Sequence, residues 1–388
     1  MSHALLVFGW RTALLALVST QVLILACSLL KATRNRPANR ILAALLTVIV
    51  GLLTPFTIGF AGFYDAWPWL SFAPFAIPLA VGPLVYAYAF ALITGAPPRR
   101  LSLHLAPAAV QFAYQATCFA LPLDLKNGWN GSVHTRWIDP LVSLAAIGSL
   151  TAYARRSLRL LRQYRQTLGD IVSDENRYAA HWLRNFLIAV VAVLGAEVAF
   201  QGWELVFGRL NYFDVFGLYV LIGFFGLYLA VEGWRHAEFA FPHLTAPAEA
   251  GASTTAPEKD WATLGARWAA RVKAEQWWAD PDLSLPQLAA RLGVNTHHLS
   301  RALNEGLGTN FATFINTLRS QAVADALAAG SNEELLTLAL DAGFSSKASF
   351  NRCFKAAFDV TPSTFRQQLN VSKAKDLTLD PVLRRAEG

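Results

Sequence analysis

Apolar residues gather in long runs over the first 235 positions, and polar or charged residues separate the runs. Each run is close to the ~20 residues that an α-helix needs to cross the ~30 Å hydrocarbon core of a bilayer. The pattern therefore predicts an all-α fold that begins with a bundle of seven membrane-spanning helices. The predicted spans are 12–30, 41–60, 70–94, 101–121, 138–154, 183–207 and 214–233.

Beyond the last run, the pattern changes to that of a water-soluble helical protein. Residues 237–258 are rich in Ala, Pro, Ser and Thr and lack apolar periodicity, which is typical of a flexible linker. The chain thus divides into a seven-helix membrane domain at 1–236, this linker, and a soluble α-helical domain at 259–388.

The soluble domain is predicted to open with an amphipathic helix at about 259–279. Trp261, Leu264, Trp268 and Val272 follow the helical spacing and share one face of it. Packing against the rest of the domain explains this face. A contact with a second copy of the chain is the alternative, and it makes a homodimer one of the expected partners.

The soluble domain also contains an internal duplication. A small residue is followed four positions later by a glycine in both copies, as a helix-turn-helix requires. The offset is fifty residues up to the turn and fifty-one after it. The matched pairs are Leu288 with Leu338, Ala289 with Ala339, Gly293 with Gly343, Val294 with Phe344, Asn295 with Ser345, Leu299 with Phe350, and Arg301 with Arg352. Two helix-turn-helix units are predicted, at about 284–305 and 333–357.

Polar residues at the predicted helix starts have the chemistry of N-terminal caps. Asn295 in the first unit and the pair Ser345–Ser346 in the second precede the helix that follows each turn. Ser284 is predicted to cap the first helix of the first unit. Ser331 and Glu334 have the spacing of a capping box at the start of the second unit.

A longer helix is predicted between the two units, at about 309–329. A helix of that length extends ~31 Å. One turn of DNA repeats every ~34 Å. A rod of this length can therefore hold two recognition helices in successive major grooves on one face of a duplex.

The order of these motifs resembles the DNA-binding domain of the AraC/XylS family of bacterial transcription regulators. The resemblance is carried by "LSLPQLAARLGVNTHHLSRALNEGLGTNFATFINTLRSQAVADAL" and "LLTLALDAGFSSKASFNRCFKAAFDVTPSTFR", and it covers about residues 270–370. It implies sequence-specific binding of double-stranded DNA by the second helix of each unit. The first of these helices ends in "RALNEG", where relatives often have an aromatic residue and a Lys, which implies fewer phosphate contacts.

The resemblance also implies the positions that contact bases. These are His297, Ser300 and Arg301 in the first unit, and Lys347, Ser349 and Arg352 in the second. Arg can bond both acceptors on the guanine edge, and Ser and His are adaptable hydrogen-bonding groups. Contacts to the DNA backbone are expected from Asn304, Asn351 and Lys355.

Neither a metal nor another cofactor is expected. His297 and His298 are adjacent, but no Cys or carboxylate stands at ligand spacing around them. Cys27, Cys118 and Cys353 have no obvious partners and are interpreted as structural. The chain has no His-Glu-x-x-His motif, phosphate-binding glycine loop or Gly-x-Ser-x-Gly motif, so we do not expect an enzyme.

The distribution of charge predicts a membrane topology. Residues 1–257 hold 18 Lys and Arg against 12 Asp and Glu, whereas residues 258–388 hold 15 against 14. If the amino terminus is outside, the cytoplasmic segments of the bundle hold 14 Lys and Arg and the opposite side holds four. This bias predicts a multi-pass protein of the bacterial cytoplasmic membrane with its DNA-binding domain in the cytoplasm. The nearly neutral soluble domain should bind DNA non-specifically only modestly and in a salt-sensitive way.

Several polar residues fall inside predicted spans, where they are costly and often functional. Glu197, Gln201 and Glu204 share one face of the sixth span, and Gln111 and Gln115 share one face of the fourth. A ligand-sensing cavity that opens away from the cytoplasm is one interpretation. Hydrogen bonds that only hold the helices together are the other.

These features favour a membrane-anchored one-component transcription regulator, in which a small molecule or membrane signal sensed by the bundle controls sequence-specific DNA binding. A flexible linker transmits no torque, which favours control through dimerisation. Proteolytic release of the DNA-binding module is a second route. The alternative function is a membrane transporter or enzyme that carries the DNA-binding module as an accessory.

Overall fold

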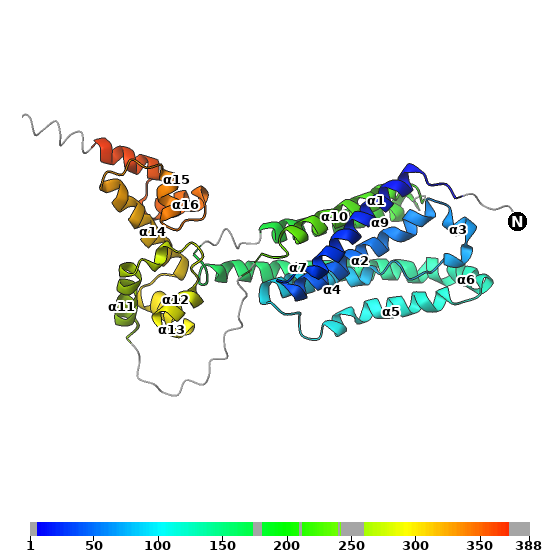
Figure 1. Ribbon diagram of the computed structural model, residues 1–388. Helices are drawn as coiled ribbons and strands as arrows, with labels where there is room; N and C mark the ends of the chain where they lie inside the picture. Colours follow the sequence, from blue (N-terminus) through cyan, green and yellow to red (C-terminus); the bar gives the residue numbers. More distant parts are fainter. Residues whose placement is uncertain (1–5, 174–180, 209–211, 240, 242–259, 372–388) are drawn as a thin grey trace, which may run out of the picture. The chain divides into compact units, whose positions relative to one another are not determined.

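The computed structural model describes residues 6–173, 181–208, 212–239, 241 and 260–371 (Figure 1). Regular structure in these residues is helical, apart from one isolated antiparallel bridge between Val172 and Ser284. The chain forms two compact units, Met1–Tyr164 with His181–Thr245 and Arg165–Ala180 with Ala246–Gly388. The segment that begins at Arg165 therefore belongs with the second unit, although it lies between the predicted fifth and sixth spans.

Twelve helical elements of the first unit are described, counting those within the ranges above. They are α1 (Trp10–Lys31), α2 (Arg36–Gly59), α3 (Phe63–Ala66), η1 (Pro68–Leu70), η2 (Pro78–Ala80), α4 (Val81–Thr94), α5 (Leu101–Phe119), α6 (Leu123–Trp129), the π-helix η3 (Asn130–Ile138), α7 (Asp139–Leu168), α9 (His181–Phe207) and α10 (Phe216–Arg235). The boundary between the two units lies after Tyr164, inside α7.

Five stretches of the described chain are helices long and apolar enough to cross a membrane. They are Trp10–Lys31, Arg36–Gly59, Leu123–Leu168, Trp182–Phe200 and Phe216–Arg235. The predicted third and fourth spans correspond to α4 and α5, which are outside this set. Helix α4 has 14 residues and extends only ~21 Å, because the chain before it is interrupted by Pro74 and Pro78. In α5, polar residues such as His104, Gln111 and Gln115 lower the mean hydropathy. The count of seven spans stays a prediction.

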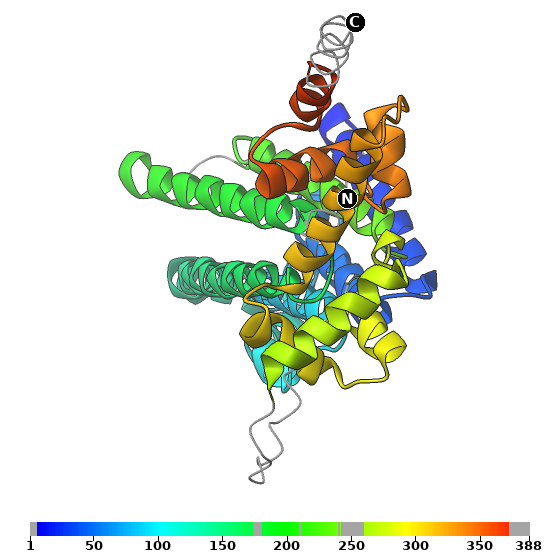
Figure 2. The same cartoon turned by 90° about the vertical axis from the view of Figure 1, so that its left-hand side faces the viewer.

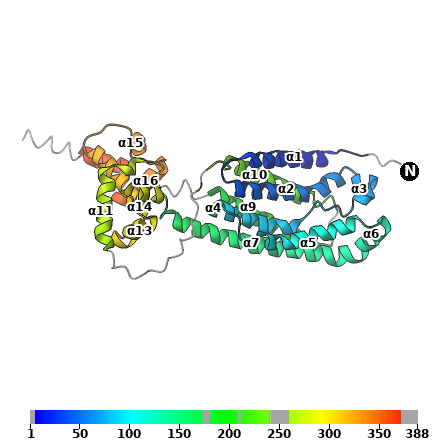
Figure 3. The ribbon, with the colours of Figure 1, turned by 60° about the horizontal axis from the view of Figure 1, so that its bottom comes forward.

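Helix α2 packs against α1, α4 and α10, and Figure 3 shows α1 and α2 side by side. Its side chains Leu45, Leu46 and Leu53 are fully buried. Helix α10 approaches it closely because glycine is at the crossing: a Cβ built at Gly226 would lie 2.8 Å from Cγ2 of Ile49. Small residues at such crossings are typical of membrane bundles, where close packing rather than hydrophobic burial holds helices together.

The chain that leaves α10 is fastened to the loop between α1 and α2. The carboxylate of Glu238 accepts hydrogen bonds from the Thr33 amide at 2.6 Å, the Thr33 hydroxyl at 3.0 Å and the Arg34 amide at 3.2 Å. The Thr33 amide contributes most to lowering the pKa of Glu238 below its ordinary value. Nδ2 of Asn35 donates to the Phe239 carbonyl at 2.7 Å. The predicted linker thus begins with residues packed on the first unit, and residues 242–258 lie outside the described part of the chain.

The second unit is a cluster of short helices around one longer one. Its elements are α11 (Trp261–Ala274), η4 (Trp277–Ala279), α12 (Leu285–Leu292), α13 (Thr296–Arg301), the π-helix η5 (Ala302–Gly306), α14 (Phe311–Ala328), α15 (Leu335–Asp341), α16 (Lys347–Phe358) and a final helix at 362–371. Figure 2 shows α14 between the yellow helices of the first helix-turn-helix and the orange helices of the second.

Helix α14 contributes to both hydrophobic cores of this unit. Phe311 and Ile315 near its start are buried with α11, α12 and α13. Val323 and Leu327 near its end are buried with α15 and α16. Its 18 residues extend ~27 Å, somewhat less than the sequence pattern predicts.

The Trp-lined face of α11 packs against other helices of the second unit. Trp268 and Val272 are buried in the first core, and Trp261 and Leu264 pack against it. Packing therefore accounts for much of this face in the described structure, and a homodimer contact stays a prediction. The helix itself ends at Ala274, and residues 277–279 form a separate turn.

The predicted helix caps agree with the structure in the first helix-turn-helix and partly in the second. Ser284 is the N-cap of α12, and Oδ1 of Asn295 accepts from the His297 amide at 2.8 Å. Ser346 caps α16 through a 3.2 Å bond from the Ser349 amide. The capping box of Ser331 and Glu334 is wrong. Helix α15 begins only at Leu335, so Glu334 is itself the N-cap, and the Ser331 hydroxyl accepts instead from the Glu333 amide at 3.3 Å.

Gly293 and Gly343 occupy equivalent turns, with φ angles of 72° and 87°, but their surroundings differ. Nothing lies within 4 Å of a Cβ built at Gly293, whereas one at Gly343 would lie 2.5 Å from the Ala279 carbonyl oxygen. We expect Gly293→Ala to cost only the left-handed strain of about 1–2 kcal/mol. Gly343→Ala should cost more, because a backbone oxygen cannot rotate away. Hydrogen exchange of the α12–α13 and α15–α16 amides in the full chain measures each local opening, and equal losses of protection would contradict the expectation.

Candidate nucleic-acid interface

Helix α13 is the second helix of the first helix-turn-helix. Leu299 is buried on one side of it, and Ala302 and Leu303 of η5 continue the buried side. The opposite side exposes His297 and Arg301. Of the remaining predicted contact residues, Asn304 is exposed and Ser300 is half-buried, and Nδ2 of Asn304 donates to the Ser300 hydroxyl at 3.3 Å. The structure thus brings these four residues onto one stretch of surface.

Arg301 is held by two neighbours on that surface. Its Nε and Nη2 atoms donate to the two carboxylate oxygens of Glu305, each at 2.8 Å. Its guanidinium carbon also lies 4.7 Å from the ring centroid of Trp261. The hydrogen bond raises the pKa of Arg301 and lowers the pKa of Glu305. Any duplex that bonds to Arg301 must compete with Glu305 for it, because both offer acceptors to the same donors.

Helix α16 is the second helix of the second helix-turn-helix. Phe350 and Phe354 are buried in the second core. The outward side of the helix exposes four of the predicted contact residues. These are Lys347, Asn351, Arg352 and Lys355.

Ser349 lies on the inner side of α16 with only 2% of its surface exposed. Its amide donates to the capping hydroxyl of Ser346. We therefore interpret Ser349 as a packing residue, and not as the base contact that the resemblance implies. Small size is sufficient reason for Ser at this position, where a larger side chain would meet the core.

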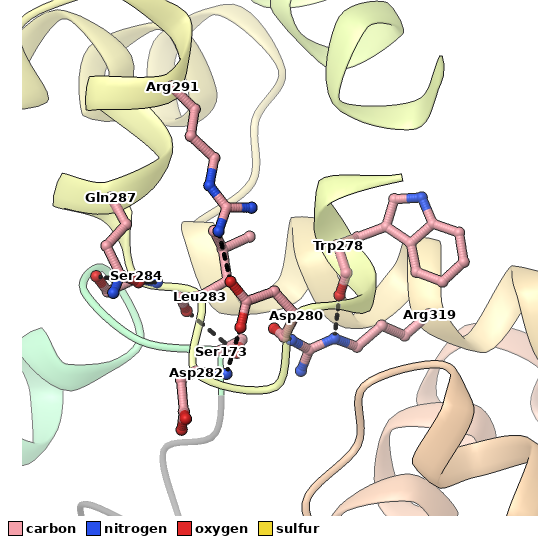
Figure 4. A network of polar contacts seen from close by, with 9 residues as sticks. All are labelled: Ser173, Trp278, Asp280, Asp282, Leu283, Ser284, Gln287, Arg291 and Arg319. Atoms are coloured by element: carbon pink, nitrogen blue, oxygen red, sulfur yellow. Dashed lines mark hydrogen bonds and ion pairs between the residues drawn. The ribbon is translucent and has the colours of Figure 1, made fainter. Parts of the chain in front are cut away.

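The two helix-turn-helix units are joined through a buried arginine that the sequence analysis does not single out. Arg319 of α14 is 1% exposed, and its Nε and Nη2 donate to the carbonyls of Trp278 and Asp280, both at 2.7 Å. Figure 4 shows this contact beside the 2.6 Å ion pair between Arg291 and the Asp280 carboxylate. The guanidinium of Arg319 also lies 5.9 Å from the ring of Phe344, in the second helix-turn-helix. A charged residue in register with Ile315 and Val323 was the available sequence signal.

Comparison with known proteins bears on this arrangement. A family model described as a helix-turn-helix domain, of AraC type, matches residues 288–368. An uncharacterized HTH-type transcriptional regulator of Staphylococcus aureus strain MSSA476 is 40% identical over 85 residues, which are 22% of this chain and 11% of that protein. The multiple antibiotic resistance protein MarA of Salmonella typhimurium is 34% identical over 84 residues, which are 22% of this chain and 65% of MarA. Residues 288–368 are an AraC-type helix-turn-helix domain.

A solved structure also matches part of this chain. The C-terminal domain of AraT, a response regulator from Geobacillus stearothermophilus, covers 28% of this chain and 88% of its own, with 23% identity and a TM-score of 0.25. This chain spans only about a tenth of the staphylococcal relatives and less than two thirds of MarA. Within the described residues, no group of three or more His, Cys, Asp or Glu could hold a metal ion.

The first unit contains a cavity of about 300 Å³. Gln111 and Gln115 of α5, which the sequence singles out, are among its lining residues. Tyr114, His134 and Asp139 add further polar groups that the sequence analysis missed. Tyr114 shares a helix face with the two glutamines. His134 lies in η3, between the predicted fourth and fifth spans, where the sequence pattern gives no sign of a cavity. The side chains of Glu197, Gln201 and Glu204 lie outside the described part of the structure.

Several polar groups of the cavity have hydrogen-bond partners. The Tyr114 hydroxyl lies 3.0 Å from Nδ1 of His134 and accepts a 3.0 Å bond from Nε1 of Trp129. Nε2 of Gln115 donates to the Ala76 carbonyl at 3.1 Å, while its Oε1 is buried and has no partner among the described residues. A buried carbonyl oxygen without a donor is costly, so a molecule that brings a donor to it gains affinity.

We expect Glu305→Gln to strengthen DNA binding, because it removes the carboxylate that competes for Arg301. An exposed ion pair is weak, so the gain should be at most about fivefold. Glu275→Gln, at an exposed position in the same unit, removes the same charge without touching Arg301. Fluorescence anisotropy of the full chain in nanodiscs with a labelled duplex gives both affinities. The same gain in both variants would show a general charge effect and no competition at Arg301.

Proposed function

We propose that this protein is a membrane-anchored, one-component transcription regulator. The AraC-type domain binds a specific DNA duplex, and a signal bound in the first unit controls this binding. The supporting observation is the pair of helix-turn-helix units that share α14 and expose polar faces on α13 and α16. The role in transcription comes from the similarity of residues 288–368 to known regulators, and the proposal adds membrane anchoring and signal sensing by the rest of the chain.

In the proposed DNA complex, each exposed face enters a major groove. Arg301 and Arg352 would bond guanine edges, because a guanidinium can donate to O6 and N7 together. Lys355 and Asn351 would fix the helix on the phosphate backbone, which gives affinity without choosing a sequence. His297, Ser300, Asn304 and Lys347 complete the proposed contacts.

The proposed location is the bacterial cytoplasmic membrane. The five long apolar helices support insertion, and the excess of Lys and Arg in the segments assigned to the cytoplasm supports a seven-span topology with the amino terminus outside. This orientation leaves the AraC-type domain in the cytoplasm, where it can reach the chromosome.

The proposed sensory site is the cavity of the first unit. Most of its wall is apolar, with side chains such as Ile49, Val81 and Ile147, and its polar groups come from α5, η3 and the start of α7. Such a lining fits a small amphipathic molecule with an apolar body. Its polar end would carry a hydrogen-bond donor for Oε1 of Gln115.

Substitution of the two arginines tests the DNA contacts. After selection of a duplex from random sequence by the full chain in nanodiscs, Arg301→Ala and Arg352→Ala should each cost about 1–3 kcal/mol and relax base choice at one position. Lys355→Ala should instead weaken all duplexes alike and reduce the salt dependence by about one unit of slope. Unchanged base preference in both arginine variants would remove them from the interface.

Filling the cavity tests the sensory site. Ala146 lines the cavity on α7, whereas the neighbouring Ala145 is exposed on the other side of the helix. We expect organic extracts of the purified full chain to contain an amphipathic small molecule in the wild type and in Ala145→Phe. Ala146→Phe should lose it, because the ring occupies the space. Mass spectrometry compares the three extracts, and identical extracts would exclude the cavity as the binding site.

A further inference from the structure

The segment that follows α7 is folded back onto the end of that helix. The amide of Asp170 donates to the Thr167 carbonyl at 3.1 Å, and the amides of Ile171 and Val172 donate to the Leu168 carbonyl at 3.0 Å. Val172 and the next residue, Ser173, are 5% and 3% exposed. Partial burial also raises the pKa of the Asp170 carboxyl. Residues 169–173 are thus a short, hydrogen-bonded extension of α7, and we refer to them as the α7 turn.

The α7 turn satisfies backbone groups at the starts of two helices in the AraC-type domain. The amide of Leu285, the first residue of α12, donates to the Ile171 carbonyl at 2.9 Å. The amide of Ala312, in the first turn of α14, donates to the Gly169 carbonyl at 2.9 Å. The first amides of a helix have no partner within it, so each must find one elsewhere. Two such amides find theirs in a segment more than 100 positions earlier in the sequence.

Ser173 extends this contact. Its carbonyl accepts a 2.7 Å bond from Nδ2 of Asn316, a residue of α14 that is 8% exposed. Its hydroxyl donates to the Leu283 carbonyl at 3.5 Å, and Val172 pairs with Ser284 in the antiparallel bridge. Figure 4 shows Ser173 beside Leu283, in the loop whose Asp280 carbonyl also binds Arg319.

We propose that the starts of α12 and α14 form a docking site for the α7 turn, and that its docking holds the first helix-turn-helix in the arrangement that binds DNA. This inference rests on the proposed function. It names α7 as the element that connects the cavity with the AraC-type domain, in place of the linker at 237–258 and of control through dimerisation alone.

The course of α7 supports this role. Its early turns supply Asp139, Ser143 and Ala146 to the cavity wall, and its last residue, Leu168, is followed directly by the docked turn. A continuous helix transmits a shift or rotation that a flexible linker does not. The contacts of the α7 turn described above involve none of the predicted DNA-contacting residues. Docking therefore leaves the DNA-binding face open and favours binding, whereas undocking leaves buried amides of α12 and α14 without partners.

A first variant weakens the docked state. Asn316→Leu keeps the branched shape and the number of heavy atoms of the side chain and removes its bond to Ser173, while Oδ1 of Asn316 has no described partner to lose. In the full chain in nanodiscs, with the selected duplex, we expect about tenfold weaker DNA binding, since a buried acceptor is left unsatisfied. Gln321→Leu, at an exposed position on the same helix, is the control and should bind as the wild type does.

A disulfide then restores docking in the weakened variant. Val172 and Ser284 are paired across an antiparallel bridge, where Cα atoms lie about 4.5–5.5 Å apart and a disulfide can form. Copper phenanthroline oxidises the two thiols of Val172→Cys/Ser284→Cys/Asn316→Leu to one disulfide, with oxygen as the electron acceptor. We expect the oxidised triple variant to bind DNA as tightly as the wild type, and the dithiothreitol-reduced form to bind as weakly as Asn316→Leu. The two single-cysteine versions should not be rescued.

The outcomes separate this inference from the proposed function. Wild-type affinity of Asn316→Leu, or an oxidised triple variant that stays as weak as the reduced one, would overturn the docking role while leaving DNA binding established. Failure of the wild type to select any duplex would overturn the proposed function itself.

Discussion

The buried guanidinium of Arg319 determines how the two halves of the AraC-type domain are arranged. Enclosing a charged group costs several kcal/mol unless hydrogen bonds replace its water. The carbonyls of Trp278 and Asp280 supply those bonds, and they belong to the segment that leads into the first helix-turn-helix. The same side chain lies against Phe344 and close to Gly343 in the second. One side chain of α14 thus contacts both helix-turn-helix units, whose cores α14 also joins.

A second set of contacts involves the turn after α7. The amides at the starts of α12 and α14 are bonded to carbonyls of that turn, and Asn316 bonds to Ser173. Carbonyls of loop 278–284 accept hydrogen bonds from both Arg319 and Ser173. The first helix-turn-helix is therefore held by residues far apart in the sequence. Because α7 also lines the cavity, a molecule bound there would contact the helix whose end packs on the first helix-turn-helix.

The sequence predicted the features that depend on neighbours along the chain. The duplicated turns at Gly293 and Gly343, the caps at Asn295 and Ser346, and the exposed polar face of α16 all follow from local spacing and backbone chemistry. The capping box at Ser331 failed because the chain stays irregular up to Glu334, which pattern alone does not show. The burial of Ser349 was not visible either, because a small polar residue fits both a DNA-contacting surface and a crowded core.

What the sequence by itself determined is the division into apolar spans and a duplicated helix-turn-helix domain, because hydrophobic periodicity and turn residues act over a few positions. The glutamines of α5 as cavity residues were also visible, since polar groups in an apolar run are costly. Only the tertiary structure decided that His134 and Tyr114 share a cavity and that Arg319 contacts both helix-turn-helix units. It also decided that residues 169–173 pack on the first helix-turn-helix. These contacts join residues far apart in the sequence, and their partners are mostly backbone carbonyls, which every residue type carries.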